Sequence, residues 1–276
     1  MENNPLSKYF REPGIHIDLP SKLRWYSDDF IETSVNHEVA IYPMTGKDEL
    51  LLKNPDSLLN GSAIEEVIKS CVPGIKNPRN LIAPDADALM LAIRVCSYGD
   101  HMDVSSKCPN CGFDNEYSIN VRNALENMEY LEDEYEIELN SSLKAVLSPY
   151  EYGDMVKSTL AAHREAKLLN DLEREEYTEE QKKELFNDTF NSLSKLKFEL
   201  LSKSIIKIIT PDDEVKDKKF ISEFINNIDK DMFKILETKI EKINSTGPNK
   251  TMNFVCQSCS HNWETEVIFD PANFFG

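Results

Sequence analysis

The fold class that the sequence predicts is α+β, a mainly helical protein with a split four-cysteine ribbon. Two Cys-x-x-Cys turns, at 108–111 and 256–259, are each flanked by short sequences of strand type. Elsewhere, apolar residues recur mostly with the three-to-four-residue spacing of helices. Because 144 residues lie between the two turns, the ribbon halves are predicted to enclose a helical insertion.

The first predicted region, residues 1–99, is α+β and mostly helical after residue 44. Short apolar pieces at 15–19 and 39–42 predict strands. Four local signals then predict where helices begin and end. They are the N-cap pairs Thr45–Asp48 and Ser62–Glu65, a helix start at Pro84–Asp85 and a helix stop at Gly99.

Residues 122–250 are predicted to be an acidic, mostly helical insertion. Alternation at 134–139, followed by an apolar piece at 143–147, predicts a hairpin near its start. Helical spacing then continues to about residue 242. The predicted features are a capping box at Thr178–Gln181, an apolar helical stripe that runs on through Ile205 and Ile208 to Pro211, and two helices around 218–227 and 230–243. The acidic pairs Asp85–Asp87 and Asp212–Asp213 are interpreted as helix caps.

Residues 100–121 together with 251–276 are predicted to form the split ribbon. A Cys-x-x-Cys turn brings two thiolates to one side of the backbone. Two such turns on separate hairpins complete a tetrahedral shell of sulfurs at about 2.3 Å from a zinc ion. The sequence therefore predicts one structural zinc ion. Its ligands would be Cys108, Cys111, Cys256 and Cys259, which leave no open coordination position for catalysis.

Other interpretations of the cysteines stay open. A thioredoxin-like redox pair needs its Cys-x-x-Cys at a helix start, whereas both turns here lie between strands. An iron–sulfur cluster also uses four thiolates but has no further support in the sequence, and two unliganded pairs are a third alternative. His261 could replace one thiolate, while Cys71 and Cys96 lie on apolar helical stripes and are predicted core residues.

The composition excludes several classes of function. Lys plus Arg number 31 and Asp plus Glu 49, so the formal net charge is −18, which disfavours binding to nucleic acid or to an anionic membrane. No stretch approaches the roughly 18 apolar residues of a transmembrane helix, and the start of the chain does not resemble a secretory signal. No nucleophile elbow, phosphate loop or HExxH motif is present. We therefore expect neither an enzyme nor a small-molecule substrate.

Six segments outside the central insertion form a recognisable set. They are NPLSKYFREPGIHIDLPS at 4–21, VAIYPMT at 39–45, DELLLKNPD at 48–56, VIKSCVP at 67–73, DALMLAIR at 87–94 and DPANFFG at 270–276. Together they resemble the baseplate hub and hub-assembly proteins of T-even-like bacteriophages. The likeness is strongest in residues 1–112 and 251–276 and weak in the central insertion.

The resemblance implies a non-enzymatic role in assembling the hub of the phage tail baseplate. The expected partners are other hub or wedge proteins, with Phe274 and Phe275 as candidate contacts. The expected location is the host-cell cytoplasm during assembly, or the virion tail. Two alternatives are a zinc-ribbon nucleic-acid-binding or transcription-related factor, which the net charge disfavours, and a zinc-dependent enzyme, which the full thiolate shell disfavours.

Overall fold

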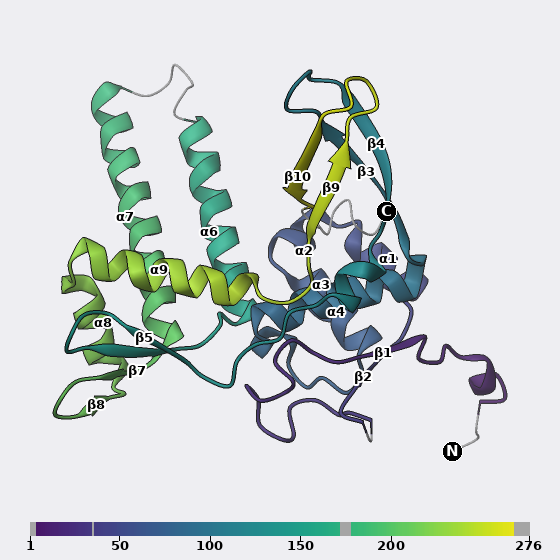
Figure 1. Cartoon of the computed structure of the whole chain (residues 1–276), viewed down its shortest axis with the longest axis horizontal. Helices are drawn as coiled ribbons and strands as arrows, with labels where there is room; N and C mark the ends of the chain where they lie inside the picture. The colour runs from purple at the N-terminus through teal and green to yellow at the C-terminus, as the bar shows by residue number, and fades with distance from the viewer. Residues whose placement is uncertain (1–3, 35, 172–177, 268–276) are drawn as a thin grey trace.

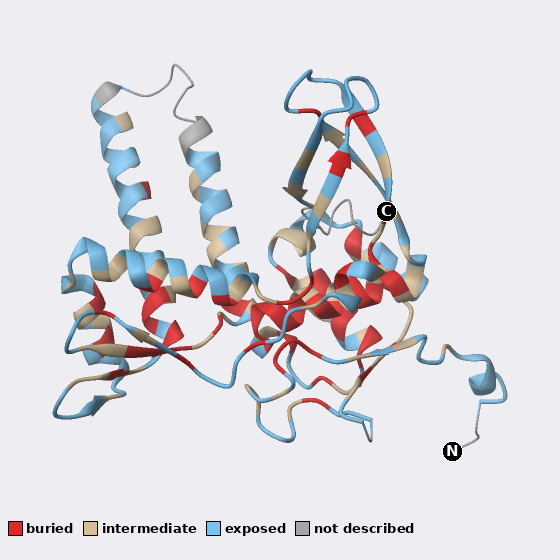
Figure 2. Ribbon diagram, in the orientation of Figure 1, coloured by how far each residue is buried: buried red, intermediate tan, exposed pale blue. Residues whose placement is uncertain are grey.

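The computed structural model describes residues 4–34, 36–171 and 178–267. Mixed helices and antiparallel strands confirm an α+β protein. Figure 1 shows two bodies side by side, from which a two-helix arm and a pair of β-hairpins project in the same direction. Buried residues are concentrated in the two bodies, whereas the arm and the hairpins are largely exposed (Figure 2). No helix among the described residues is long and apolar enough to cross a membrane.

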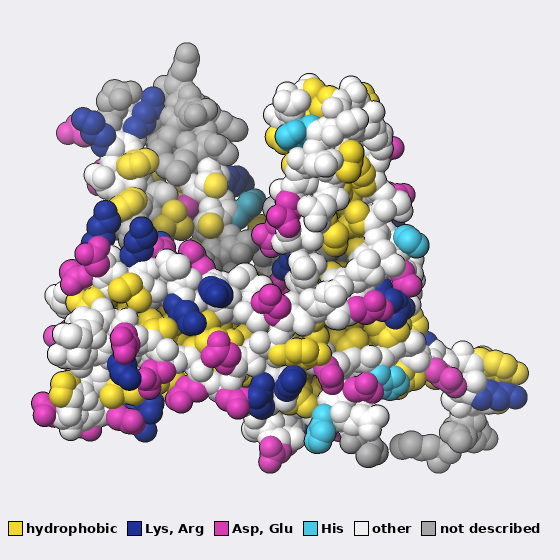
Figure 3. Space-filling model, in the orientation of Figure 1, with side chains coloured by type: hydrophobic (Ala, Val, Ile, Leu, Met, Phe, Trp, Pro, Cys, Tyr) yellow, Lys and Arg dark blue, Asp and Glu magenta, His cyan; other side chains and the backbone are white. Residues whose placement is uncertain are grey.

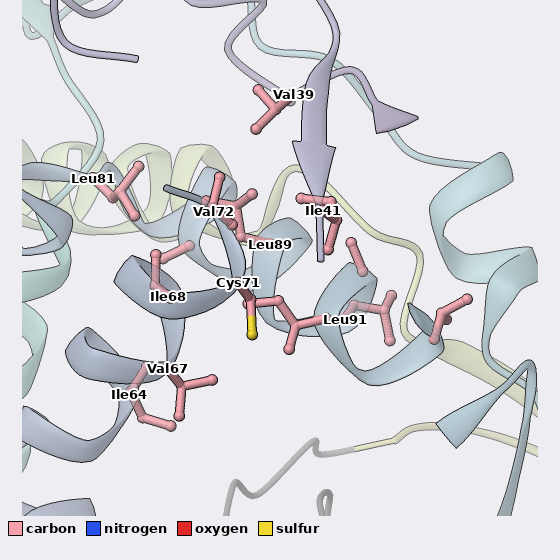
Figure 4. Packing of buried hydrophobic residues seen from close by; sticks show 14 of the residues in the cluster. Val39, Ile41, Ile64, Val67, Ile68, Cys71, Val72, Leu81, Leu89 and Leu91 are labelled. Carbon is pink, nitrogen blue, oxygen red and sulfur yellow. The ribbon is translucent and has the colours of Figure 1, made fainter. Parts of the chain in front are cut away.

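The first body, here called the N-terminal core, packs helices against a two-stranded antiparallel sheet. Figure 4 shows Val39 and Ile41 of the sheet, Cys71 of α3, and Leu89 and Leu91 of α4 gathered in one apolar cluster. All five side chains are buried, so this cluster fixes the two longest helices of the core. The elements are η1 (Ser7–Tyr9), β1 (Ile15–Ile17), β2 (Val39–Ile41), α1 (Gly46–Leu52), α2 (Pro55–Leu59), α3 (Ser62–Cys71), η2 (Pro78–Asn80) and α4 (Ala83–Tyr98).

Two helix boundaries of this core confirm the sequence prediction. Thr45 caps α1 through a complete capping box. The Thr45 hydroxyl accepts from the N–H of Asp48, and the Asp48 carboxylate accepts from the N–H of Thr45. Helix α4 has Pro84 in its first turn and ends at Gly99, whose φ of 84° suits glycine.

The predicted N-cap role of Ser62 is wrong, because Gly61 occupies the N-cap of α3. Gly61 has a φ of 76°, and a Cβ at this position would lie 2.7 Å from the Val156 side chain. Only glycine fits where α3 begins beneath a neighbouring helix. The Asn60 side chain instead accepts the N–H of Ser62 at 2.9 Å.

The second body, here called the insertion core, is a four-stranded antiparallel sheet in the order β5-β6-β7-β8, packed against helices. The hairpin predicted at 134–139 and 143–147 is confirmed as β5 and β6. Its elements are β5 (Tyr135–Glu138), β6 (Lys144–Leu147), β7 (Ile205–Ile209), β8 (Glu214–Val215), α8 (Lys218–Asn227) and α9 (Lys230–Ser245). The short helix α5 (Arg122–Glu126) packs instead on the N-terminal core, where Ala124 is buried.

The helical stripe predicted through Ile205 and Ile208 is wrong, because both residues lie in β7. Four of the five residues from 205 to 209 are isoleucine, and β-branched side chains favour strands. Pairing with β6 then settles the choice, since Ala145 lies opposite Ile208 and both are buried.

The projecting pair of helices, here called the helical arm, consists of α6 (Tyr152–Asp171) and α7 (Glu179–Ser204). The predicted capping box at Thr178 and Gln181 is confirmed at the start of α7. The outer part of the arm leaves apolar side chains in solvent, with Phe186 and Phe190 56% and 64% exposed.

The acidic pairs do not act as helix caps. Asp85 lies in the first turn of α4 but is fully buried, and its carboxylate accepts from Ser21 and Tyr26 rather than from its own helix. Asp87 forms an ion pair with Lys250. The second pair lies in the β7–β8 turn, where the carbonyl of Asp213 accepts from Thr210. The carboxylates of Asp85 and Asp87 therefore tie separate segments together, and Asp212 and Asp213 belong to a turn between strands.

Candidate metal centre

The four cysteines of the two turns lie at the tips of two antiparallel hairpins. β3 (His101–Lys107) pairs with β4 (Asp114–Asn120), and β9 (Thr251–Val255) pairs with β10 (Asn262–Glu266). In both hairpins the two strands are in continuous register up to the cysteine turn. The two tips lie next to each other in Figure 1, although they come from the middle and the end of the chain.

The two cysteine turns have the same backbone geometry. In each, the N–H of the first cysteine donates to the carbonyl five residues later, at 2.9 Å in both turns. The carbonyl of that cysteine accepts from the N–H four residues later, at 2.9 Å for Cys108 and 3.0 Å for Cys256. The residue at this fourth position has a left-handed backbone, with φ of 72° at Gly112 and 58° at Ser260. This shared turn directs both sulfurs of each pair to one side.

The structure brings all four predicted ligands together. Their sulfur atoms all lie within 4.8 Å of one another. The Sγ atoms of Cys108 and Cys259 are 3.8 Å apart, and those of Cys111 and Cys256 are 3.6 Å apart. Sulfurs placed tetrahedrally at about 2.3 Å from an ion are about 3.8 Å apart, so the arrangement fits one tetrahedral metal ion. It is the one group of three or more metal-ligating side chains found among the residues that the structure describes.

The first cysteine of each pair is buried and the second is exposed. Burial acts to raise the pKa of Cys256, but hydrogen bonds from the N–H groups of Cys259 and Ser258 outweigh it and lower the pKa to about 6. At Cys111 the N–H of Phe113 acts to lower the pKa, whereas desolvation of the sulfur by its neighbours and the three adjacent thiols raise it to about 12. Crowded thiols cannot all ionise without a cation, whereas a bound metal ion keeps its thiolate ligands deprotonated.

An aromatic contact joins the hairpins below the cysteines. The ring centroids of Tyr117 on β4 and Phe254 on β9 are 4.5 Å apart, and Trp263 lies beside both. The Tyr117 hydroxyl also donates to the carbonyl of Val255 at 2.9 Å. The two hairpins therefore also pack together through this aromatic group, and not only at the cysteines.

The sequence interpretation missed Asn115, which links the two turns. Its side chain is fully buried, its oxygen accepts the N–H of Gln257 at 2.9 Å, and its amide donates to the Phe113 carbonyl at 3.0 Å. Asn110 was also missed, and its amide donates to the sulfur of Cys259 at 3.6 Å. The available signal was the closeness of both amides to a ligand in the sequence. Asn110 directly precedes Cys111, and Asn115 follows it by four residues. Polar side chains near metal ligands commonly hydrogen-bond to them or orient them.

The other candidate residues lie outside the cluster. His261 stacks on Trp263, with ring centroids 6.3 Å apart, and is not in the metal-ligating group. Cys71 is buried in the N-terminal core and Cys96 is half-buried, with its thiol 3.5 Å from the Ile41 carbonyl. Phe274 and Phe275 lie outside the described residues.

Comparison with known proteins gives a match to a protein family. A family model described as T4 bacteriophage base plate protein matches residues 26–276. These residues include the N-terminal core from β2 onward, the insertion core, the helical arm and the two hairpins. No curated protein and no solved structure matches the chain.

Proposed function

The chain belongs to the T4 bacteriophage base plate protein family, and on that premise we propose that it acts in assembling the baseplate hub through contacts with other baseplate proteins. The family match over residues 26–276 carries this proposal. The resemblance of residues 4–21 to hub and hub-assembly proteins supports the narrower role. In this proposal the chain binds and positions partners and catalyses no reaction.

Exposed aromatic side chains on two projecting elements support a role in binding proteins. At the N-terminus, Tyr9 and Phe10 are 73% and 61% exposed. They lie beside Arg11, whose guanidinium donates to the backbone and the hydroxyl of Ser70 at 2.6 and 2.8 Å. The second group is on the helical arm, as described above. Aromatic side chains held on anchored segments are enriched among residues that dominate protein interfaces.

The metal in this proposal is a single zinc ion with a structural role. Zinc prefers a tetrahedral set of thiolates, and four cysteine ligands leave no position for a substrate. The ion would join the chain's end to its middle, because Cys111 and Cys256 are adjacent across the cluster. The two hairpins would then present one rigid surface next to the N-terminal core.

Quantitative mass spectrometry of purified phage particles and of infected cells tests the assembly role. A small integral number of copies per particle is expected if the chain stays in the tail baseplate. Presence in infected cells together with hub proteins, without copies in the particle, is expected if it leaves the baseplate before maturation. Absence of the chain from both particles and hub-containing complexes would contradict the proposal.

Metal analysis of the purified full-length chain tests the zinc ion separately. We expect one zinc per chain in the wild type and in Cys96→Ser, whose thiol lies outside the cluster. Cys256→Ser should lose the metal and melt at a lower temperature, because a ligand is missing from the shell. Unchanged metal content and stability in Cys256→Ser would refute a four-cysteine zinc site.

A further inference from the structure

An apolar groove of about 730 Å³ lies where α2, α4 and α6 meet in the N-terminal core. Figure 1 places these helices near the base of the hairpins. The floor of the groove is formed by buried residues of α3 and α4, such as Ile64 and Leu91. Its walls include Leu58, Met90 and Met155, of which Met155 is 39% exposed. The volume is within the range of about 300–1,000 Å³ of pockets that bind ligands.

The described chain ends beside this groove. The N–H of Val267 donates to the carbonyl of Lys250 at 2.9 Å, and Lys250 is itself one of the residues lining the groove. The ammonium group of Lys250 pairs with Asp87 of α4, which also lines it. Val267, the last described residue, therefore lies at the edge of the groove, directly after the β9–β10 hairpin.

The sequence that follows Val267 has the composition of an apolar ligand. Residues 268–276 read IFDPANFFG, with four large apolar side chains and a single charge at Asp270. Nine extended residues reach about 30 Å at roughly 3.3 Å each. The segment is thus long enough to enter the groove, because Val267 is hydrogen-bonded to Lys250 at the edge of the groove. Lys53 at the groove offers a partner of opposite charge to Asp270.

We propose that the groove is the docking site of the chain's own residues 268–276, with Phe274 and Phe275 as its apolar anchors. Burying these side chains removes apolar area from water both in the segment and in the groove, at about 25 cal/mol per Å². A covalently attached segment has an effective concentration in the millimolar range, which favours it over a free partner or a second copy. The proposal concerns contacts within one chain and does not depend on the baseplate role.

Photo-crosslinking of the purified full-length chain tests the docking. With p-benzoyl-phenylalanine in place of Phe274, we expect cross-links within the monomer to peptides from α2, α4 or α6, identified by mass spectrometry. The same photoreactive residue in place of Phe220, which is 62% exposed on α8 of the insertion core, should give none to these peptides. Cross-links to a second copy, cross-links only to the hairpins, or no cross-link at all would overturn the proposal.

A matched pair of variants checks that the groove itself binds the segment. Met155→Glu places a charge in the groove and should abolish the cross-link, whereas Phe190→Glu, on the same arm but outside the groove, should keep it. Because Met155→Glu can disturb α6, a second measurement changes only residues of the docking segment and leaves the groove intact. The double variant F274S/F275S should raise deuterium uptake in residues 83–91 and 152–159, and unchanged uptake there would contradict docking.

Discussion

At the scale of single residues, the buried carboxyl group of Asp85 joins the start of α4 to the irregular segment around Ser21. Its oxygens accept from the backbone N–H of Ser21 at 2.9 Å and from the Tyr26 hydroxyl at 2.7 Å. Tyr26 in turn accepts the N–H of Ile82 at 3.0 Å. Every donor in this network has an acceptor, which is what burial demands of polar groups. Burial nevertheless outweighs the hydrogen bonds and raises the pKa of Asp85 to about 6.

The raised pKa predicts a pH dependence of folding stability that Asp85→Asn should remove. Between about pH 4 and pH 6 the native state binds the Asp85 proton more tightly than the unfolded state does, so stability falls as the pH rises. The wild type should therefore gain up to about 3 kcal/mol relative to Asp85→Asn when the pH falls from about 7 to about 4. Urea unfolding of both proteins across this range measures the difference.

Comparing the two proteins cancels effects that they share, such as the loss of metal from protonated thiols at low pH. A stability difference that stays constant from about pH 4 to pH 7 would show that Asp85 titrates normally. A difference that changes in the opposite direction would show that its pKa is lowered and that the hydrogen bonds, not burial, dominate.

At the scale of elements, each cysteine turn depends on one residue with a left-handed backbone. Gly112 meets this need without strain, whereas Ser260 takes the same conformation with a side chain. A Cβ added at Gly112 would have no atom within 4 Å. A substitution there consequently tests the backbone conformation alone, without steric contact.

We expect Gly112→Ala to destabilise the protein by about 1 kcal/mol, because alanine avoids positive φ. Gly46→Ala is the matched control. Gly46 is also free of contacts around an added Cβ but is the first residue of α1, where alanine should be neutral or stabilise by up to about 1 kcal/mol. Thermal unfolding of the metal-loaded variants measures both. Equal effects of the two substitutions would contradict a conformational role for Gly112.

How far the sequence predicts the structure also differs from element to element. The hairpins and their cysteines were predictable because the ligands are three residues apart and strand-type sequence flanks them. Strand β7 was not, because an isoleucine-rich run after an apolar helical stripe fits either a helix or a strand until β6 is in place. The N-cap at Gly61 depends on Val156, a residue 95 positions away in sequence. Asn115 acquires its role only when the second hairpin supplies Gln257.

At the scale of the whole molecule, two cores with separate apolar clusters are linked by backbone hydrogen bonds, such as that from the N–H of Ala83 to the carbonyl of Tyr150. The buried residues separate into two apolar clusters, one of which includes Phe254 and Ile119 of the hairpins. The insertion core lies entirely within the loop that the metal would close, between Cys111 and Cys256. The hairpins are therefore stabilised by packing on the N-terminal core, whereas the insertion core is stabilised by an apolar cluster of its own.

This division predicts an unequal response to metal removal. Adding a chelator should increase deuterium uptake first in β3, β4, β9 and β10, because four uncompensated thiols then repel one another as they ionise. The sheet β5–β8 should keep its protection, since its apolar cluster contains no residue of the hairpins. Cys256→Ser should already show the increased uptake before chelator is added and should change little afterwards. Loss of protection throughout both cores at the same chelator concentration would show that the metal holds the whole chain in one cooperative unit.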